Sequence, residues 1–152
     1  MKKTYSETEL LIKAQAYCSA AEHCPSELRT KLKAWGCSDQ LTADSIINDL
    51  IQERFIDETR YCIAFARDKC RFNSWGKLKI SLALKAKGLS PEAIQTGIDS
   101  IDEEDYSMIL RRLLEQKAKT LNCSDERELK AKLLRYAYSK GFIPPESFPP
   151  ES

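Results

Sequence analysis

One segment sets the pattern for the whole chain: Ser26-Glu27-Leu28-Arg29-Thr30-Lys31-Leu32-Lys33-Ala34-Trp35-Gly36. In this segment, leucines stand eight and four residues before a glycine. The same offsets recur later, with Ile80 and Leu84 before Gly88, and with Leu133 and Ala137 before Gly141. Apolar residues four apart share one helix face, and a following glycine can end the helix in the left-handed conformation. Because the glycines recur about every 52 residues, the pattern predicts a repeat protein with units too small to bury their own apolar faces.

The apolar spacing elsewhere predicts an all-α fold of about nine helices, the ninth short or missing. No alternating apolar segment indicates a strand. We expect three tandem three-helix repeats at residues 5–55, 56–103 and 104–143. The last repeat is expected to be truncated, because the proline-rich tail at 144–152 cannot hold a long helix.

Capping residues predict where several helices begin. Thr42 or Asp44 is expected to cap the third helix, and Asp57 the first helix of the second repeat. Ser90-Pro91 combines a cap with a proline at the first helical position. The remaining expected starts are Asp105, for the third repeat, and Ser124-Asp125, for its second helix.

Charges nearly cancel over the chain, with 24 Lys and Arg against 23 Asp and Glu. This balance gives no global attraction to nucleic acid or membrane, so an electrostatic function needs local clusters. No segment is apolar over the width of a bilayer, and the first residues lack the apolar core of a signal peptide. We therefore expect a cytoplasmic protein that does not associate with membranes.

The six cysteines do not follow a zinc-binding pattern. There is no Cys-x-x-Cys, and His23 is the only histidine, so we expect neither a metal nor a cofactor. Reduced cysteines that pack as small apolar groups are the simpler interpretation, and Cys18 falls on the apolar stripe of its helix. A lone histidine supplies no nucleophile–base pair, and no glycine-rich phosphate loop is present, so we do not expect an enzyme.

Positive charge does cluster in the middle of the chain. Residues 67–87 contain one acid, Asp68, and seven basic residues: Arg67, Lys69, Arg71, Lys77, Lys79, Lys85 and Lys87. Residues 92–105 contain six acids and no base. Such segregation can present a positive surface to a polyanion or to an acidic protein groove. Phe72 and Trp75 lie inside the basic segment, where they could stack on a base, form part of an interface, or pack between repeats.

Taken together, these residues resemble the RecX family, regulatory proteins that bind the bacterial recombinase RecA. The resemblance covers about residues 17–142. Its most specific part is Ile56-Asp57-Glu58-Thr59-Arg60-Tyr61, which is similar to the Asp-Asp/Glu-x-Arg-Phe/Tyr motif that opens the family's second repeat. Also matching are Cys24-Pro25-Ser26-Glu27-Leu28, Gly36, Gly76-Lys77, Lys87-Gly88-Leu89 and Lys140-Gly141-Phe142. We expect Asp57 and Arg60 to act as a helix cap and an inter-helix ion pair, and Tyr61 to face inward.

The resemblance implies an elongated, curved arrangement of the three repeats. It also implies that the protein binds in the groove of the RecA–DNA filament and suppresses its ATP hydrolysis, strand exchange and extension. We expect a monomer whose basic residues contact the filament, with single- or double-stranded DNA as a further candidate partner. Two features differ from the family pattern. Cys62 stands where alanine is common, and the proline-rich tail replaces most of a ninth helix.

Two other interpretations fit part of the pattern. Leu84, Gly88 and Ile94 have the spacing of a helix-turn-helix turn, which is typical of proteins that act directly on DNA. The helix after that turn carries Glu92 and Asp99, however, which have the wrong sign for a groove lined with phosphates. The third interpretation is a helical scaffold for an unrelated partner.

Overall fold

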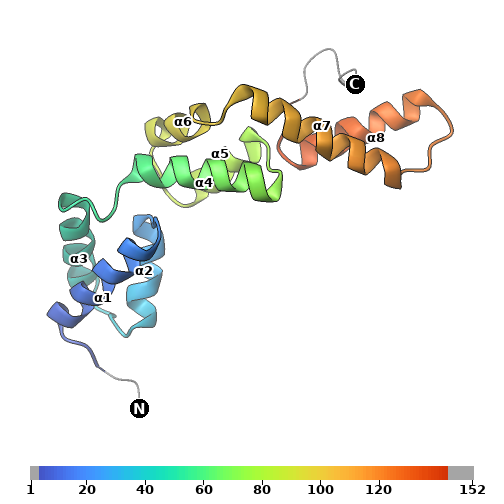
Figure 1. The fold of residues 1–152 in the computed structure, drawn as a ribbon. Coiled ribbons are helices and arrows are strands. Elements are labelled where there is room, and N and C mark those ends of the chain that lie inside the picture. Colours follow the sequence, from blue (N-terminus) through green and yellow to red (C-terminus); the bar gives the residue numbers. More distant parts are fainter. Residues whose placement is uncertain (1–3, 144–152) are drawn as a thin grey trace.

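The computed structural model describes residues 4–143, which are all-helical and contain no strand, as predicted. The helices lie in an extended row, with α1–α3, α4–α6 and α7–α8 as successive groups (Figure 1). Eight helices occur in this range: α1 (Glu7–Ala20), α2 (Pro25–Ala34), α3 (Gln40–Gln52), α4 (Glu58–Asn73), α5 (Lys77–Ala86), α6 (Pro91–Asp99), α7 (Glu103–Thr120) and α8 (Glu126–Ser139). The proline-rich tail expected at 144–152 lies outside the described residues. None of the described helices is long and apolar enough to span a membrane.

The three glycines of the repeated segment end α2, α5 and α8 in the same way. Gly36, Gly88 and Gly141 have φ angles of 93°, 86° and 92°. In each case the N–H of the next residue donates to the carbonyl of the apolar residue four positions before the glycine, at 2.9, 3.3 and 2.9 Å respectively. This bond is the signature of a helix that ends on a left-handed residue. The three segments therefore have the same local geometry.

Helix starts agree with the sequence at three predicted caps. The side chains of Asp57, Ser90 and Asp125 each accept a hydrogen bond from a backbone N–H in the first turn of α4, α6 and α8. These bonds satisfy donors that have no partner inside the helix.

Two predicted starts were wrong. Asp39 caps α3 in place of Thr42 or Asp44, because its carboxylate reaches the Leu41 N–H, and it also accepts from the Thr42 hydroxyl. Asp102 caps α7 three residues before Asp105, whose own N–H donates to it. In both cases the earlier of two suitable polar residues is the cap.

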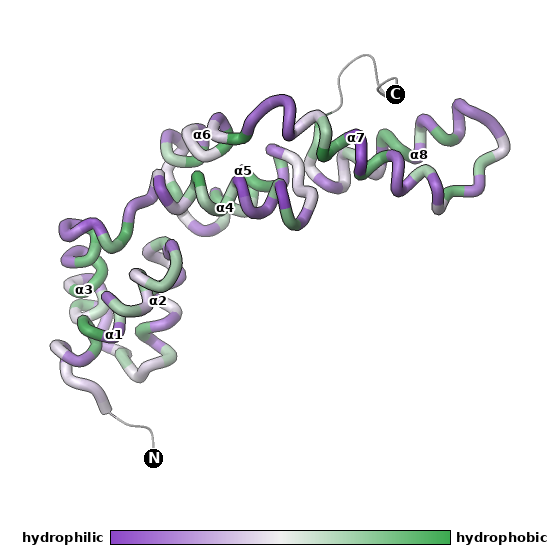
Figure 2. The backbone as a smooth tube through the Cα atoms, viewed as in Figure 1, coloured by the Kyte–Doolittle hydropathy of each residue, from purple (hydrophilic) through white to green (hydrophobic). Residues whose placement is uncertain are grey.

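Each group of helices encloses its own apolar cluster. Leu28 and Leu32 lie in the first, Ile80 and Leu84 in the second, and Leu133, Ala137 and Phe142 in the third. Figure 2 shows the corresponding apolar stretches alternating with polar ones along the helices. The expected boundaries at 55/56 and 103/104 stay a prediction.

Four of the six cysteines are buried among these apolar side chains: Cys18, Cys24, Cys62 and Cys70. Burial raises the pKa of the Cys18 and Cys62 thiols to about 11, so both are uncharged at neutral pH. They therefore pack as small apolar groups.

Backbone contacts join the second and third groups, and we call this contact the glycine seam. The Gly76 N–H donates to the Lys140 carbonyl at 2.7 Å, and the Leu78 N–H donates to the Gly141 carbonyl at 3.0 Å. A Cβ on Gly76 would lie 2.2 Å from the Gly141 carbonyl carbon, closer than real carbon atoms approach. The start of α5 can therefore touch the end of α8 only while residue 76 has no side chain.

One carboxylate joins the first group to the second, and we call this contact the Glu27 junction. Glu27 accepts from the Tyr61 hydroxyl at 3.2 Å and from the Cys24 N–H at 3.3 Å. It also lies 3.2 Å from His23 Nδ1 and 3.4 Å from Lys87 Nζ. Burial by itself raises the pKa of Glu27, but the hydrogen bonds from Cys24, His23 and Lys87 outweigh burial and hold this pKa below its usual value.

Replacing Gly76 with alanine should disrupt the glycine seam. Gly76 has φ −78°, which alanine adopts freely, so the loss would come from the clash with the Gly141 backbone. We expect Gly76→Ala to lower the free energy of unfolding by about 3 kcal/mol in urea denaturation, the upper range for overpacking. Gly88→Ala is the control, because it has open space around it and should cost only about 1 kcal/mol for its left-handed backbone. Equal losses in the two variants would contradict the seam.

Acid should weaken the Glu27 junction. Because the folded-state pKa of Glu27 is lowered, its contribution to stability is present above the unfolded pKa of about 4.3 and is lost as pH falls below it. We expect Glu27→Gln to be less stable than wild type by on the order of 1 kcal/mol at pH 7, after allowing for partial exposure. Urea denaturation at pH 7, 5 and 3.5 should show the difference between the two proteins shrinking only at the lowest pH. A constant difference across that range would contradict this role of Glu27.

Candidate functional site

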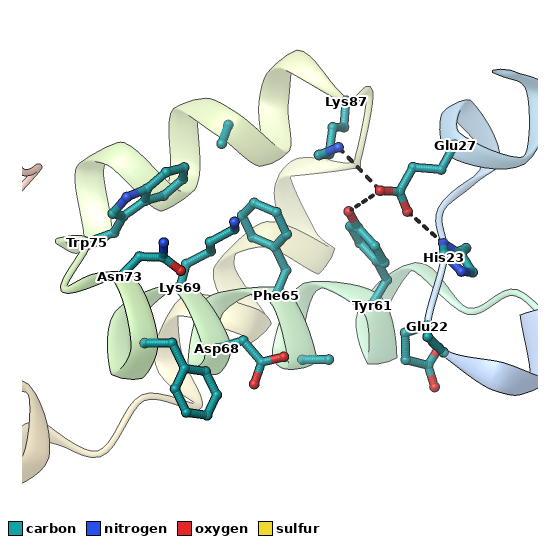
Figure 3. A pocket seen from close by; sticks show the side chains of 14 residues that line it. Glu22, His23, Glu27, Tyr61, Phe65, Asp68, Lys69, Asn73, Trp75 and Lys87 are labelled. Atoms are coloured by element: carbon teal, nitrogen blue, oxygen red, sulfur yellow. Dashed lines mark hydrogen bonds and ion pairs between the residues drawn. The ribbon is translucent and has the colours of Figure 1, made fainter.

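A groove of about 570 Å³ runs between α4 and α5 and reaches residues 21–27 at the start of α2 (Figure 3). We call it the α4–α5 groove. Helix α4 contributes side chains one turn apart, namely Tyr61, Phe65, Lys69 and Phe72. Their spacing of three or four residues places them on one side of the helix. The groove therefore spans the first and second groups of helices.

Trp75 lies at one end of the groove, at the turn between α4 and α5. The Lys69 and Lys79 ammonium groups lie over its ring, 5.0 and 4.7 Å from the ring centroid. Phe65 contacts the same ring edge-on, at 6.4 Å between centroids. Cations over an aromatic face are attracted to it, so the ring positions both lysines at this end of the groove. Lys69 lines the groove itself, and Lys79 lies beside it, over the same ring.

A similar arrangement occurs in the first group, away from the groove. Lys13 and Lys31 lie over the Trp35 ring at 4.9 and 5.8 Å from its centroid. Residues 4–143 thus contain two Lys–Trp–Lys clusters, and of these two the one at Trp75 borders the α4–α5 groove.

Phe72 is the exposed aromatic residue of the groove. Phe72 is 74% exposed, whereas Trp75 and Phe65 are partly buried against the core of α4–α6. A large apolar side chain left in water beside a groove is a common feature of binding surfaces.

The other end of the groove is the Glu27 junction. Figure 3 shows Glu27 between Lys87, Tyr61 and His23, so its negative charge is balanced within the protein. The Lys87 ammonium group is therefore already paired with a carboxylate of this chain. Burial and the nearby Cys24 and Glu27 raise the pKa of Tyr61, which keeps its hydroxyl protonated as a donor to Glu27.

The seven basic residues predicted as a binding surface do not lie together. Lys69 and Lys79 meet at Trp75, and Lys85 is exposed on α5. Lys77 and Lys87 instead hold the groups of helices together, through ion pairs to Glu103 at 2.5 Å and to Glu27 at 3.4 Å.

Arg67 and Arg71 lie at a separate cavity of about 220 Å³, which is also lined by Asp102 and Asp105. The Arg67 Nε donates to the Ser100 carbonyl at 3.4 Å. These two arginines therefore lie close to acids of the 92–105 segment and are not part of the α4–α5 groove.

The motif residues of the second repeat have structural partners. Asp57 accepts from the Arg60 N–H at 2.8 Å as the α4 cap. Arg60 Nε pairs with Glu22 at 2.5 Å, and its NH2 donates to the Arg54 carbonyl at 3.0 Å. Tyr61 is buried in the second cluster.

Several residues of the groove were not singled out from the sequence. Glu27 was assigned only to the repeated segment, and His23 entered only as the one histidine of the sequence. The i, i+4 series Tyr61, Phe65, Lys69 and Asn73 was the available signal, but it cannot show which face stays open. Among residues 4–143 no group of three or more His, Cys, Asp or Glu could hold a metal ion.

The comparisons with known proteins agree on one family. Residues 57–98 match the family model described as RecX, second three-helix domain. The chain is 26% identical over 142 residues to Regulatory protein RecX of Lactobacillus johnsonii, covering 93% of this chain and 52% of that protein. It is 32% identical over 118 residues to Regulatory protein RecX of Clostridium perfringens strain SM101, covering 76% of this chain and 54% of that protein. The chain thus spans about half the length of these curated relatives.

A solved structure shares the fold. The crystal structure of RecX from Lactobacillus salivarius matches with a TM-score of 0.77 at 20% sequence identity, and the match covers 90% of this chain and 88% of that one. The model match falls on α4–α6, the group that forms most of the α4–α5 groove, and the structural match extends over most of the remaining helices. Sequence and fold agree, and this chain belongs to the RecX family of regulatory proteins.

Proposed function

We propose that this chain binds the RecA–DNA filament and inhibits its ATP hydrolysis, strand exchange and extension, and so modulates recombination and repair. The main support for this proposal is that the chain belongs to the RecX family and that its three small apolar cores lie in an extended row (Figure 1). A row of units can touch successive subunits of a polymer at once, and several weak contacts then combine into tight binding.

The proposed mechanism needs no catalytic group and no cofactor. A protein that bridges neighbouring filament subunits can block the movements between them that hydrolysis requires. The inhibitor then acts by its binding free energy alone, which must be larger for the blocked arrangement than for the active one. We propose that a monomer suffices for this bridging.

We propose Lys69, Lys79 and Lys85 as the basic residues of this contact. Lys77 and Lys87 already pair with acids of this chain, and Arg67 and Arg71 lie beside Asp102 and Asp105. Reversing Lys77 or Lys87 would confuse loss of binding with damage to the fold.

The test is the ATPase activity of RecA on single-stranded DNA with increasing amounts of this protein. We expect inhibition at amounts well below one molecule per RecA subunit, because one bridging molecule affects its neighbours. Activity that is unchanged at equimolar protein would contradict the proposal.

The alternative is a protein that acts on DNA directly, as the helix-turn-helix spacing suggested. It predicts binding to DNA in the absence of RecA, with affinity that falls steeply with salt. The exposed acids Glu92 and Asp99 on α6 argue against this alternative, because they follow the turn where such a protein meets phosphates. Gel-shift measurements without RecA, at 50 and 200 mM salt, separate the two proposals.

A further inference from the structure

We infer that the α4–α5 groove binds a short acidic peptide segment, in which an apolar side chain packs beside Phe72 and a flanking carboxylate pairs with Lys69 and Lys79. The inference rests on the proposed function only in taking a protein of the RecA filament as the source of that segment. It adds to that function the position of the contact and the chemistry of the bound partner.

The apolar part of the argument is the open aromatic wall of α4. Phe72 is largely exposed to water, and Phe65 and Ala83 also line the groove. Aromatic side chains contribute much of the free energy where they become buried at an interface. A leucine or phenylalanine of a partner would cover this wall.

The charged part of the argument is the difference among four lysines. Lys77 and Lys87 each pair with a carboxylate, whereas Lys69 and Lys79 form no ion pair within residues 4–143. Their ammonium groups lie instead over Trp75, which lines one end of the groove. Two positioned cations without an anion are complementary to a carboxylate brought by the partner.

The same geometry disfavours a nucleic-acid strand. Trp75 packs against the core and carries two cations over its ring, so it is not an open platform for a base. Asp68, Glu22 and Glu27 also line the groove. A strand brings a phosphate with every nucleotide and would meet these carboxylates, whereas a short peptide can place its acid only at the lysine end.

The binding test uses the full chain labelled with ¹⁵N and two probes. The first probe is the N-acetylated peptide Ser-Gly-Leu-Phe-Asp-Glu, which carries its acids at one end only, and the second is a dodecamer of thymidylate. We expect the peptide, at up to about 1 mM, to shift the Trp75 indole N–H signal saturably and leave the Trp35 signal in place. An unmoved Trp75 signal, equal shifts of both tryptophans, or tighter binding of the oligonucleotide at Trp75 would overturn the inference.

Matched variants test the charge. Lys69→Gln with Lys79→Gln keeps the aliphatic stems and removes both charges, and should weaken peptide binding about tenfold. Lys13→Gln with Lys31→Gln makes the same change at the Trp35 cluster and should leave peptide binding unchanged. Phe72→Ala, at an exposed position that does not support the core, should also weaken it. Wild-type affinity in the Lys69/Lys79 variant would overturn the inference.

The same variants in the RecA ATPase assay separate this inference from the proposed function. If wild type inhibits and the Lys69/Lys79 variant needs about ten times more protein to do so, both stand. If both inhibit equally, the groove inference fails and the proposed function survives. If wild type does not inhibit while the peptide still shifts Trp75, the proposed function fails and the groove belongs to another acidic partner.

Discussion

The size of the apolar cores is the constraint on which the rest of the structure depends. The middle cluster is not closed by its own helices alone. Cys24, which precedes α2, is buried in the cluster of α4–α6, and Tyr106 and Ile109 of α7 pack against both the second and the third clusters. Residues of both neighbouring groups thus complete the middle cluster, as neighbouring units do in repeat proteins. These contacts join groups that are adjacent in the chain, and the three groups lie in an extended row (Figure 1).

The lysines of residues 69–87 have two different roles. Nearby carboxylates determine whether a lysine forms an ion pair within the protein or stays open to a partner. Lys77 faces Glu103 and Lys87 faces Glu27, so these two lysines stabilise contacts between groups of helices. Lys69 and Lys79 lie over the Trp75 ring, and Lys69 also lies over the Phe65 ring. Cation–π contacts leave much of an ammonium group's capacity to pair with an anion unused. The lysines without an ion pair, Lys69 and Lys79, therefore lie near the exposed Phe72. This combination distinguishes the α4–α5 groove.

Local features were predictable from the sequence, and features that depend on distant residues were not. The offsets before Gly36, Gly88 and Gly141 gave the helix ends, because the left-handed residue and its closing bond are local. The predicted capping residue was wrong where two nearby polar residues could both serve, and the actual caps there are Asp39 and Asp102. The sequence predicted the basic segment at residues 67–87. It could not predict which of these residues form ion pairs within the protein, since the partner of Lys87 is Glu27, 60 residues away. The groove depends on which side of α4 its neighbours leave uncovered, and helical spacing alone cannot show that.

The two joints of the row respond differently to their surroundings. Salt screens ion pairs, and acid protonates carboxylates, but neither affects two glycine backbones in van der Waals contact. Salt and acid therefore act on the ion pairs at both joints, Lys87–Glu27 at the first and Lys77–Glu103 at the second. The second joint also has the backbone contacts of the glycine seam, which carry no net charge. The last two groups therefore keep part of their contact at high salt or low pH.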